Sequence, residues 1–162
     1  DLGSDMENQN LWEAYFKVGI VHERSGNWND AENNFLKALE LNTDQPDVLN
    51  YLGYSYIDMD IKMNTARDMI EKALEQKPND PYIIDSMAWY YFNTGAYEEA
   101  KSLLEYAIDI MPYDPIINDH YGDALWKSGN NVEARFHWSK ALELDPEEGT
   151  IADIKIKILR GI

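Results

Sequence analysis

Apolar residues recur along the chain at helical spacing, in blocks that short polar turns separate. In the middle of the chain this pattern predicts one helix over Pro81–Thr94 and a second over Tyr97–Ile110, with Gly95 in the turn between them. Asp80 and Asp114 each precede a proline, as expected when an aspartate caps a helix whose first residue is proline. The hydrophobic pattern therefore predicts short helices joined by tight turns.

The same pair of helices recurs along the chain with a step of 34 or 35 residues. Small residues form three aligned columns, at Gly19, Gly53, Ala88 and Gly122, at Ala31, Ala66, Ala100 and Ala134, and at Ala38, Ala73, Ala107 and Ala141. Small side chains let two helices approach closely, so each column marks a helix contact. We predict an all-α array of four units, at about residues 12–45, 46–80, 81–114 and 115–148.

These columns, with stretches such as "WYYFNTGAYEEAKSLLEYAIDIMP" and "GNNVEARFHWSKALELDP", resemble the tetratricopeptide repeat (TPR), a helix-turn-helix unit of about 34 residues. The resemblance covers about residues 12–146. It implies a right-handed superhelical solenoid, in which the first helix of each unit (helix A) lines a concave groove and the second (helix B) forms the outer wall. The stretches "LNYLGYSYIDM" and "INDHYGDALWKSGNNVEARFHW" are most similar to TPR proteins of proteobacteria, some of which are cell-envelope lipoproteins.

The second unit departs from the repeat pattern. It has one extra residue between Gly53 and Ala66, and its turn region "IDMDIKMNTA" contains no glycine. We therefore expect a longer turn of different shape between its two helices.

The two ends of the chain lie outside the repeats. Residues 149–162 are expected to form a C-terminal capping helix, beginning near Glu148 and ending near Arg160, because a repeat array needs a final cover for its last apolar face. The apolar stripe of this helix would consist of Ile151, Ile154 and Ile158. Residues 1–11 are expected to be disordered or derived from a tag.

Composition narrows the range of partners. The 30 acidic and 14 basic residues give a net charge of -16, which disfavours nucleic acids and anionic membranes, since both carry negative charge. No apolar run is long enough for direct insertion into a membrane. The absence of cysteine excludes disulfides and thiolate sites, and the bacterial cytoplasm and the periplasm or envelope are both compatible compartments.

The stretch "INDHYGDALW" places Asp119, His120 and Asp123 close together, as in a metal site or a general acid–base pair. The repeat register argues against such chemistry. Asp119 and Asp123 fall in slots that face the groove in the TPR family, whereas the slot of His120 points more toward neighbouring helices. A metal site needs three or four converging ligands, so we expect no metal, no cofactor and no enzymatic activity.

The resemblance instead indicates a protein-binding groove with a scaffold or adaptor role. Its expected lining is aromatic and acidic, and consists of Asn50, Tyr54, Tyr82, Asp85, Trp89, Phe92, Asn93, Asp119, Asp123, Trp126 and Lys127. Such a surface suits a peptide segment with basic and apolar side chains. The alternative is self-association or a structural role in a larger assembly, and a metal-dependent enzyme is the less favoured reading.

Overall fold

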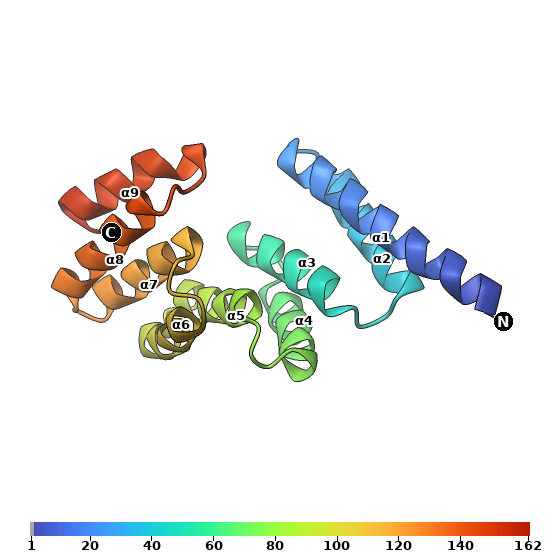
Figure 1. Cartoon of the computed structure of the whole chain (residues 1–162), viewed down its shortest axis with the longest axis horizontal. Coiled ribbons are helices and arrows are strands. Elements are labelled where there is room, and N and C mark those ends of the chain that lie inside the picture. Colours follow the sequence, from blue (N-terminus) through green and yellow to red (C-terminus); the bar gives the residue numbers. More distant parts are fainter. Residues whose placement is uncertain (1) are drawn as a thin grey trace. The chain divides into compact units, whose positions relative to one another are not determined.

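The protein is all-α, as the computed structural model in Figure 1 shows for residues 2–162, with side chains described for residues 11–162. The described part contains nine helices and no strand: α1(Leu2–Arg24), α2(Trp28–Leu41), α3(Pro46–Asp58), α4(Met63–Gln76), α5(Pro81–Asn93), α6(Tyr97–Ile110), α7(Pro115–Lys127), α8(Asn131–Glu143) and α9(Glu148–Arg160). Four helix pairs and a final helix confirm the predicted fold class. The expectation for residues 1–11 falls almost entirely outside the described side chains.

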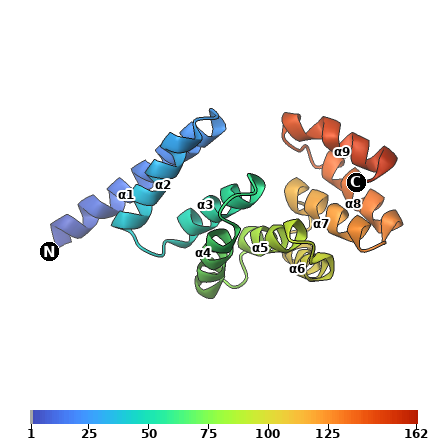
Figure 2. The ribbon, with the colours of Figure 1, turned by 180° about the vertical axis from the view of Figure 1, so that it is seen from behind.

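The first compact unit, residues 1–76, contains the pairs α1/α2 and α3/α4. The two helices of each pair pack against each other (Figures 1 and 2). In both pairs the predicted glycines lie at this contact. A Cβ atom on Gly19 would lie 2.5 Å from the ring of Phe35, and one on Gly53 would lie 2.9 Å from Ile70. The glycine column therefore allows a large side chain of helix B to rest directly on the backbone of helix A.

The second compact unit, residues 77–162, contains α5/α6, α7/α8 and α9. Trp138 on α8 is fully buried, and a Cβ atom on Gly122 of α7 would lie 2.4 Å from its ring. The alanines of both helix-B columns are also fully buried in this unit: Ala100, Ala107, Ala134 and Ala141. The sequence columns thus identify the helix contacts.

Three of the A helices begin with a side-chain cap followed by proline. The carboxylate of Asp80 accepts hydrogen bonds from the backbone N–H groups of Tyr82 and Ile83, and Asp114 caps α7 in the same way. Gln45 does so with its amide oxygen at the start of α3. Each cap satisfies N–H groups that have no partner within the helix.

The second turn differs from the others, as predicted. It spans residues 59–62, whereas the corresponding turns at residues 25–27, 94–96 and 128–130 are one residue shorter. The shorter turns place a glycine at positive φ, for example Gly95 at 84°. The second turn instead places Asp60 and Lys62 at φ values of 53° and 47°, which are less favourable for residues with a Cβ atom.

α9 covers the end of the second unit, with its helix bounds as predicted. Ile154 is buried against Leu125, Ala134, Trp138 and Ala141. The Arg135 side chain of α8 donates a hydrogen bond of 2.9 Å from Nε to the backbone oxygen of Ile158. The opposite side of α9 exposes Ile156 and Leu159, and Ile162, which follows the end of α9, is also exposed. None of the described helices is both long and apolar enough to cross a membrane.

Ile154 and Ile156 form a matched pair for testing the capping role of α9. We expect Ile154→Ala to lower the free energy of unfolding by about 2–4 kcal/mol, because it leaves a cavity beneath α9. Ile156→Ala changes a side chain that is 52% exposed, so we expect a change of about 0.5 kcal/mol or less. Urea denaturation of both variants measures the difference, and equal effects would contradict a capping role.

Candidate functional site

The predicted groove residues lie on three A helices. Asn50 and Tyr54 lie on α3 in the first unit, and both are partly buried. In the second unit, α5 carries Tyr82, Asp85, Trp89, Phe92 and Asn93, and α7 carries Asp119, Asp123, Trp126 and Lys127. The contacts of the second-unit residues separate those that hold the fold together from those that face solvent.

Asp85 and His120 form a buried pair between α5 and α7. The Nδ1 atom of His120 lies 2.9 Å and 3.0 Å from the two carboxylate oxygens of Asp85, and His120 and Asp85 are 7% and 4% exposed. The imidazole also stacks on Trp89, with ring centroids 4.1 Å apart and planes at 12°. His120 therefore points toward a neighbouring helix, as its repeat slot predicts, and Asp85 is not exposed.

The environment of His120 favours its charged form. Burial disfavours the imidazolium, but the charge of Asp85 and the hydrogen bond to it, reinforced by Asp119 and Asp123, hold the pKa of His120 above its usual value. A protonated His120 then compensates the buried carboxylate of Asp85, which would otherwise be costly.

Asp119 and Asp123 share one cation, the ammonium of Lys157 on α9. Its Nζ atom lies 2.9 Å from both oxygens of Asp119 and 2.8 Å from Oδ2 of Asp123. The indole N–H of Trp138 donates to Oδ1 of Asp123 at 2.8 Å. Sequence reasoning missed Lys157, because it assigned the tail only an apolar covering role.

Electrostatics in this cluster reflect two carboxylates facing one ammonium. Burial raises the pKa of Asp123, Lys157 opposes this effect and Asp119 adds to it. Burial also disfavours the charged form of Lys157, but the two aspartates outweigh it and raise its pKa. Lys157 therefore stays protonated and links α9 to α7.

The three residues of the Asp119–His120–Asp123 motif diverge in the fold. His120 faces Asp85 on α5, whereas both aspartates face Lys157 on α9. Within the described side chains, no group of three or more histidine, aspartate or glutamate residues could hold a metal ion. The motif therefore acts as two structural links to different helices.

The remaining side chains give the A-helix face of the second unit an aromatic character. Trp89 and Phe92 are half-buried and stack with ring centroids 4.9 Å apart and planes at 3°. Tyr82, Asn93 and Lys127 are exposed. The guanidinium carbon of Arg135 on α8 lies 4.7 Å from the centroid of the Trp126 ring. Trp126 therefore belongs mainly to the contact between α7 and α8.

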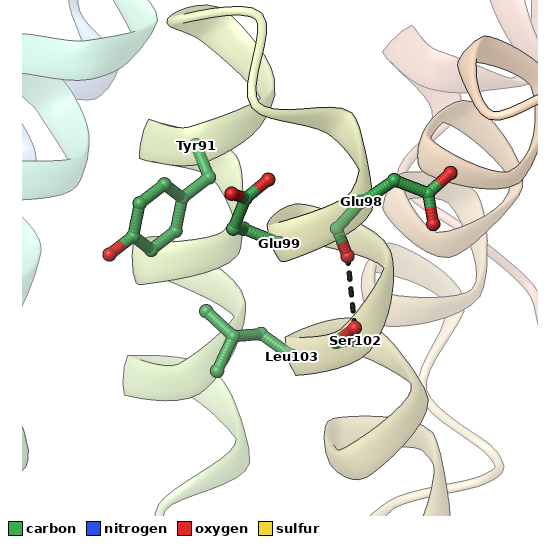
Figure 3. A pocket seen from close by; sticks show the side chains of 5 residues that line it. All are labelled: Tyr91, Glu98, Glu99, Ser102 and Leu103. Atoms are coloured by element: carbon green, nitrogen blue, oxygen red, sulfur yellow. Dashed lines mark hydrogen bonds between the residues drawn. The ribbon is translucent and has the colours of Figure 1, made fainter.

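A separate, shallow pocket of about 410 Å³ lies on α5 and α6, and none of its lining residues is a predicted groove residue. Figure 3 shows its lining residues: Tyr91, Glu98, Glu99, Ser102 and Leu103. The Ser102 hydroxyl donates to the backbone oxygen of Glu98, an ordinary bond within a helix. This lining has two carboxylates and no basic side chain, and nothing in it suggests catalytic chemistry.

The raised pKa of His120 predicts a pH-dependent stability. The contribution of its charge is fully present below the unfolded pKa of about 6.5 and is lost as the pH rises through the higher folded pKa. We expect wild type to lose stability over this range relative to His120→Asn, whose amide retains a neutral donor.

Urea denaturation of both proteins between pH 5 and pH 9, about the range over which histidine titrates, measures this difference. The comparison isolates His120 because His137, whose pKa burial lowers to about 4, is present in both proteins. Parallel stability curves would contradict a charged His120–Asp85 pair.

Thermal denaturation with and without a chelator tests the hypothesis of a metal site at Asp119, His120 and Asp123. We expect the same melting temperature in both conditions, because Asp119 and Asp123 are paired with Lys157 and His120 is paired with Asp85. A substantial drop in the melting temperature on chelation would restore the hypothesis of a metal at Asp119, His120 and Asp123.

Comparisons with known proteins agree with the repeat assignment. The family model described as tetratricopeptide repeat matches residues 12–45. The TPR repeat-containing protein PA4667 of Pseudomonas aeruginosa is 40% identical over 53 residues, a match that covers 33% of this chain and 9% of that protein. The chain thus matches only a small part of this relative.

Solved structures extend the likeness to nearly the whole chain. A structure of Pseudomonas aeruginosa PilF superposes with a TM-score of 0.75 at 20% identity, covering 93% of this chain and 70% of that one. TTC0263, a TPR protein of Thermus thermophilus, gives a TM-score of 0.78 at 18% identity, with coverage of 92% and 84%. At these identities the likeness shows the fold alone.

TPR folds are protein–protein interaction modules, and the family is generally non-catalytic. The family match at residues 12–45, the recurring sequence columns and the fold shared with known TPR structures together show that this chain contains a tetratricopeptide repeat and has the TPR fold.

Proposed function

We propose that the A-helix face of the second unit binds a segment of a protein partner, with Trp89 and Phe92 as its main contacts. The observation that carries this proposal is the parallel stack of these two half-buried rings. Stacking holds the two rings rigidly in place, and partly exposed aromatic residues contribute strongly to binding interfaces. Asn93, exposed beside them, supplies a polar group at the edge.

The partner segment should carry Lys or Arg beside apolar side chains. The net charge of -16 attracts a basic segment from a distance. At short range, aromatic faces attract cations. The carboxylates of Asp119 and Asp123, by contrast, already bind the ammonium of Lys157. Because these carboxylates already have partners, aromatic contacts should contribute more to affinity than new ion pairs.

The chain would act as a scaffold or adaptor that holds an extended or helical segment of its partner. We expect an affinity on the order of micromolar, because a flexible segment loses conformational entropy when it binds.

Selection from a displayed library of random peptides tests this proposal. We expect the enriched peptides to combine basic and apolar residues, and Trp89→Ala to weaken their binding about tenfold or more, since hot-spot truncations cost at least about 1–2 kcal/mol. Titration at two salt concentrations should show the Trp89→Ala loss in both.

Phe136→Ala is the matched control, because this aromatic side chain is 64% exposed on the outer helix α8. It should leave peptide binding unchanged. Peptides that bind Trp89→Ala as well as wild type, or that lose binding with Phe136→Ala instead, would move the site to the outer wall.

A structural role in assembly is a second candidate. The exposed side of α9 presents the apolar side chains of Ile156 and Leu159, and such exposed apolar groups often mark an interface. Sedimentation across a range of concentrations separates the two functions, because Leu159→Asp would abolish self-association through α9 without affecting peptide binding.

A further inference from the structure

Three nearly parallel rings connect the proposed binding face to a buried, titratable pair. Phe92 and Trp89 on α5 stack with planes at 3°, and the imidazole of His120 on α7 stacks on Trp89 with planes at 12°. The Nδ1 atom of the same imidazole lies 2.9 Å and 3.0 Å from the two carboxylate oxygens of Asp85. One ring thus contacts both the aromatic face and a buried carboxylate.

Ring contacts hold the indole of Trp89 in place. Within the described side chains, its Nε1 atom is buried and has no hydrogen-bond partner. Its stacking partners are Phe92 on the same helix and His120 on the neighbouring helix. A change at the imidazole therefore acts directly on the Trp89 ring, because no hydrogen bond of the indole opposes it.

Protonation of His120 strengthens both of its contacts. The imidazolium compensates the charge of the Asp85 carboxylate, and a cation over the face of an indole is attracted by the negative charge of that face. A neutral imidazole loses both effects. It also leaves the carboxylate of Asp85, which is 4% exposed, without a compensating charge, which weakens the contact between α5 and α7 beside Trp89.

The charges around His120 set the direction of its titration. Burial lowers the pKa of His120, but Asp85 on α5 and, to a smaller extent, Asp119 and Asp123 on α7 raise it above its usual value. From α9, Lys157 binds the last two carboxylates. The titratable groups that α6 and α8 direct at other residues of α7 are Glu105 and Asp109, which act on Tyr121, and His137, which binds Asn118.

We propose that protonation of His120 controls the aromatic face formed by Trp89 and Phe92, so that the affinity of this face for a basic, apolar segment falls when His120 loses its proton. This inference rests on the proposed function, because it regulates the same face. Loss of the imidazolium also makes the chain more negative by one charge, which by itself favours a basic segment. One charge is a small addition to a net charge of -16, so the position of Trp89 decides the direction.

The fluorescence of the full chain tests this control without any ligand. An excited indole transfers an electron to a stacked imidazolium more readily than to a neutral imidazole, so the charged form quenches its fluorescence. We expect the emission to rise between about pH 6 and pH 9, as His120 loses its proton. His120→Asn should lack this transition. Trp89→Phe keeps an aromatic ring but removes the reporting indole, and it should lack the transition as well.

Binding of one peptide tests the consequence for the face. The probe is the tightest histidine-free peptide from the library selection, with both ends blocked, so that the peptide does not titrate. In wild type its dissociation constant should rise about fivefold or more across the same pH range, a usual size for coupling between two sites, and in His120→Asn it should stay nearly constant. Asp85→Asn removes a carboxylate that raises the pKa of His120, so both transitions should move to lower pH.

Two results would overturn this inference. The first is a fluorescence transition that is missing from wild type or that is the same in His120→Asn, with the helix content of both proteins checked by circular dichroism. The second is a wild-type affinity that stays constant over this pH range while Trp89→Ala still weakens binding at its low end. Failure of the proposed function gives a different result, because Trp89→Ala would then bind the peptide as wild type does at every pH.

Discussion

The close approach of paired helices is the constraint on which the other features depend. In the α7/α8 pair, Trp138 rests on Gly122 so closely that any Cβ atom there would overlap the indole ring. This contact fixes the rotation of α7 about its own axis, because Gly122 is the one glycine of α7 and lies on one side of the helix. The rotation in turn decides which residues of α7 face α8, which face α6 and which remain outward. A larger residue at Gly122 would therefore displace the whole outward face.

Buried carboxylates impose the next constraint, because a charge removed from water needs a compensating partner. Asp85 obtains one from His120, and Asp119 and Asp123 obtain one from Lys157. These pairs connect α5 to α7 and α7 to α9, so the covering helix is held by charge as well as by Ile154. The acidic residues that a sequence pattern assigns to ligand recognition are thus largely committed to internal contacts in the second unit.

The sequence predicts most of the fold because its period, caps and turn glycines act locally. The helix contacts follow from the columns of small residues. The extra residue and the absence of glycine in the turn region "IDMDIKMNTA" correctly predict the unusual second turn. The pairing of Asp85 with His120 lies close to the repeat step, because His120 directly follows Asp119, the repeat counterpart of Asp85. Lys157 is different. It lies 38 residues from Asp119 in a tail without the repeat pattern, where alternation of isoleucine and lysine gives no indication of a partner.

This internal pairing changes which physical effect can give the proposed binding face its selectivity. A carboxylate that already holds an ammonium would have to exchange one partner for another, so a new ion pair there contributes little net free energy. The overall charge of -16 still acts at a distance and favours encounter with basic partners, but it does not distinguish one basic segment from another. Under the proposed function, discrimination depends on shape and apolar contact, for which the stack of Trp89 and Phe92 is the candidate. The imidazole of His120 stacks on Trp89 and is also bonded to Asp85. The buried ion pair therefore helps to fix the position of the Trp89 ring.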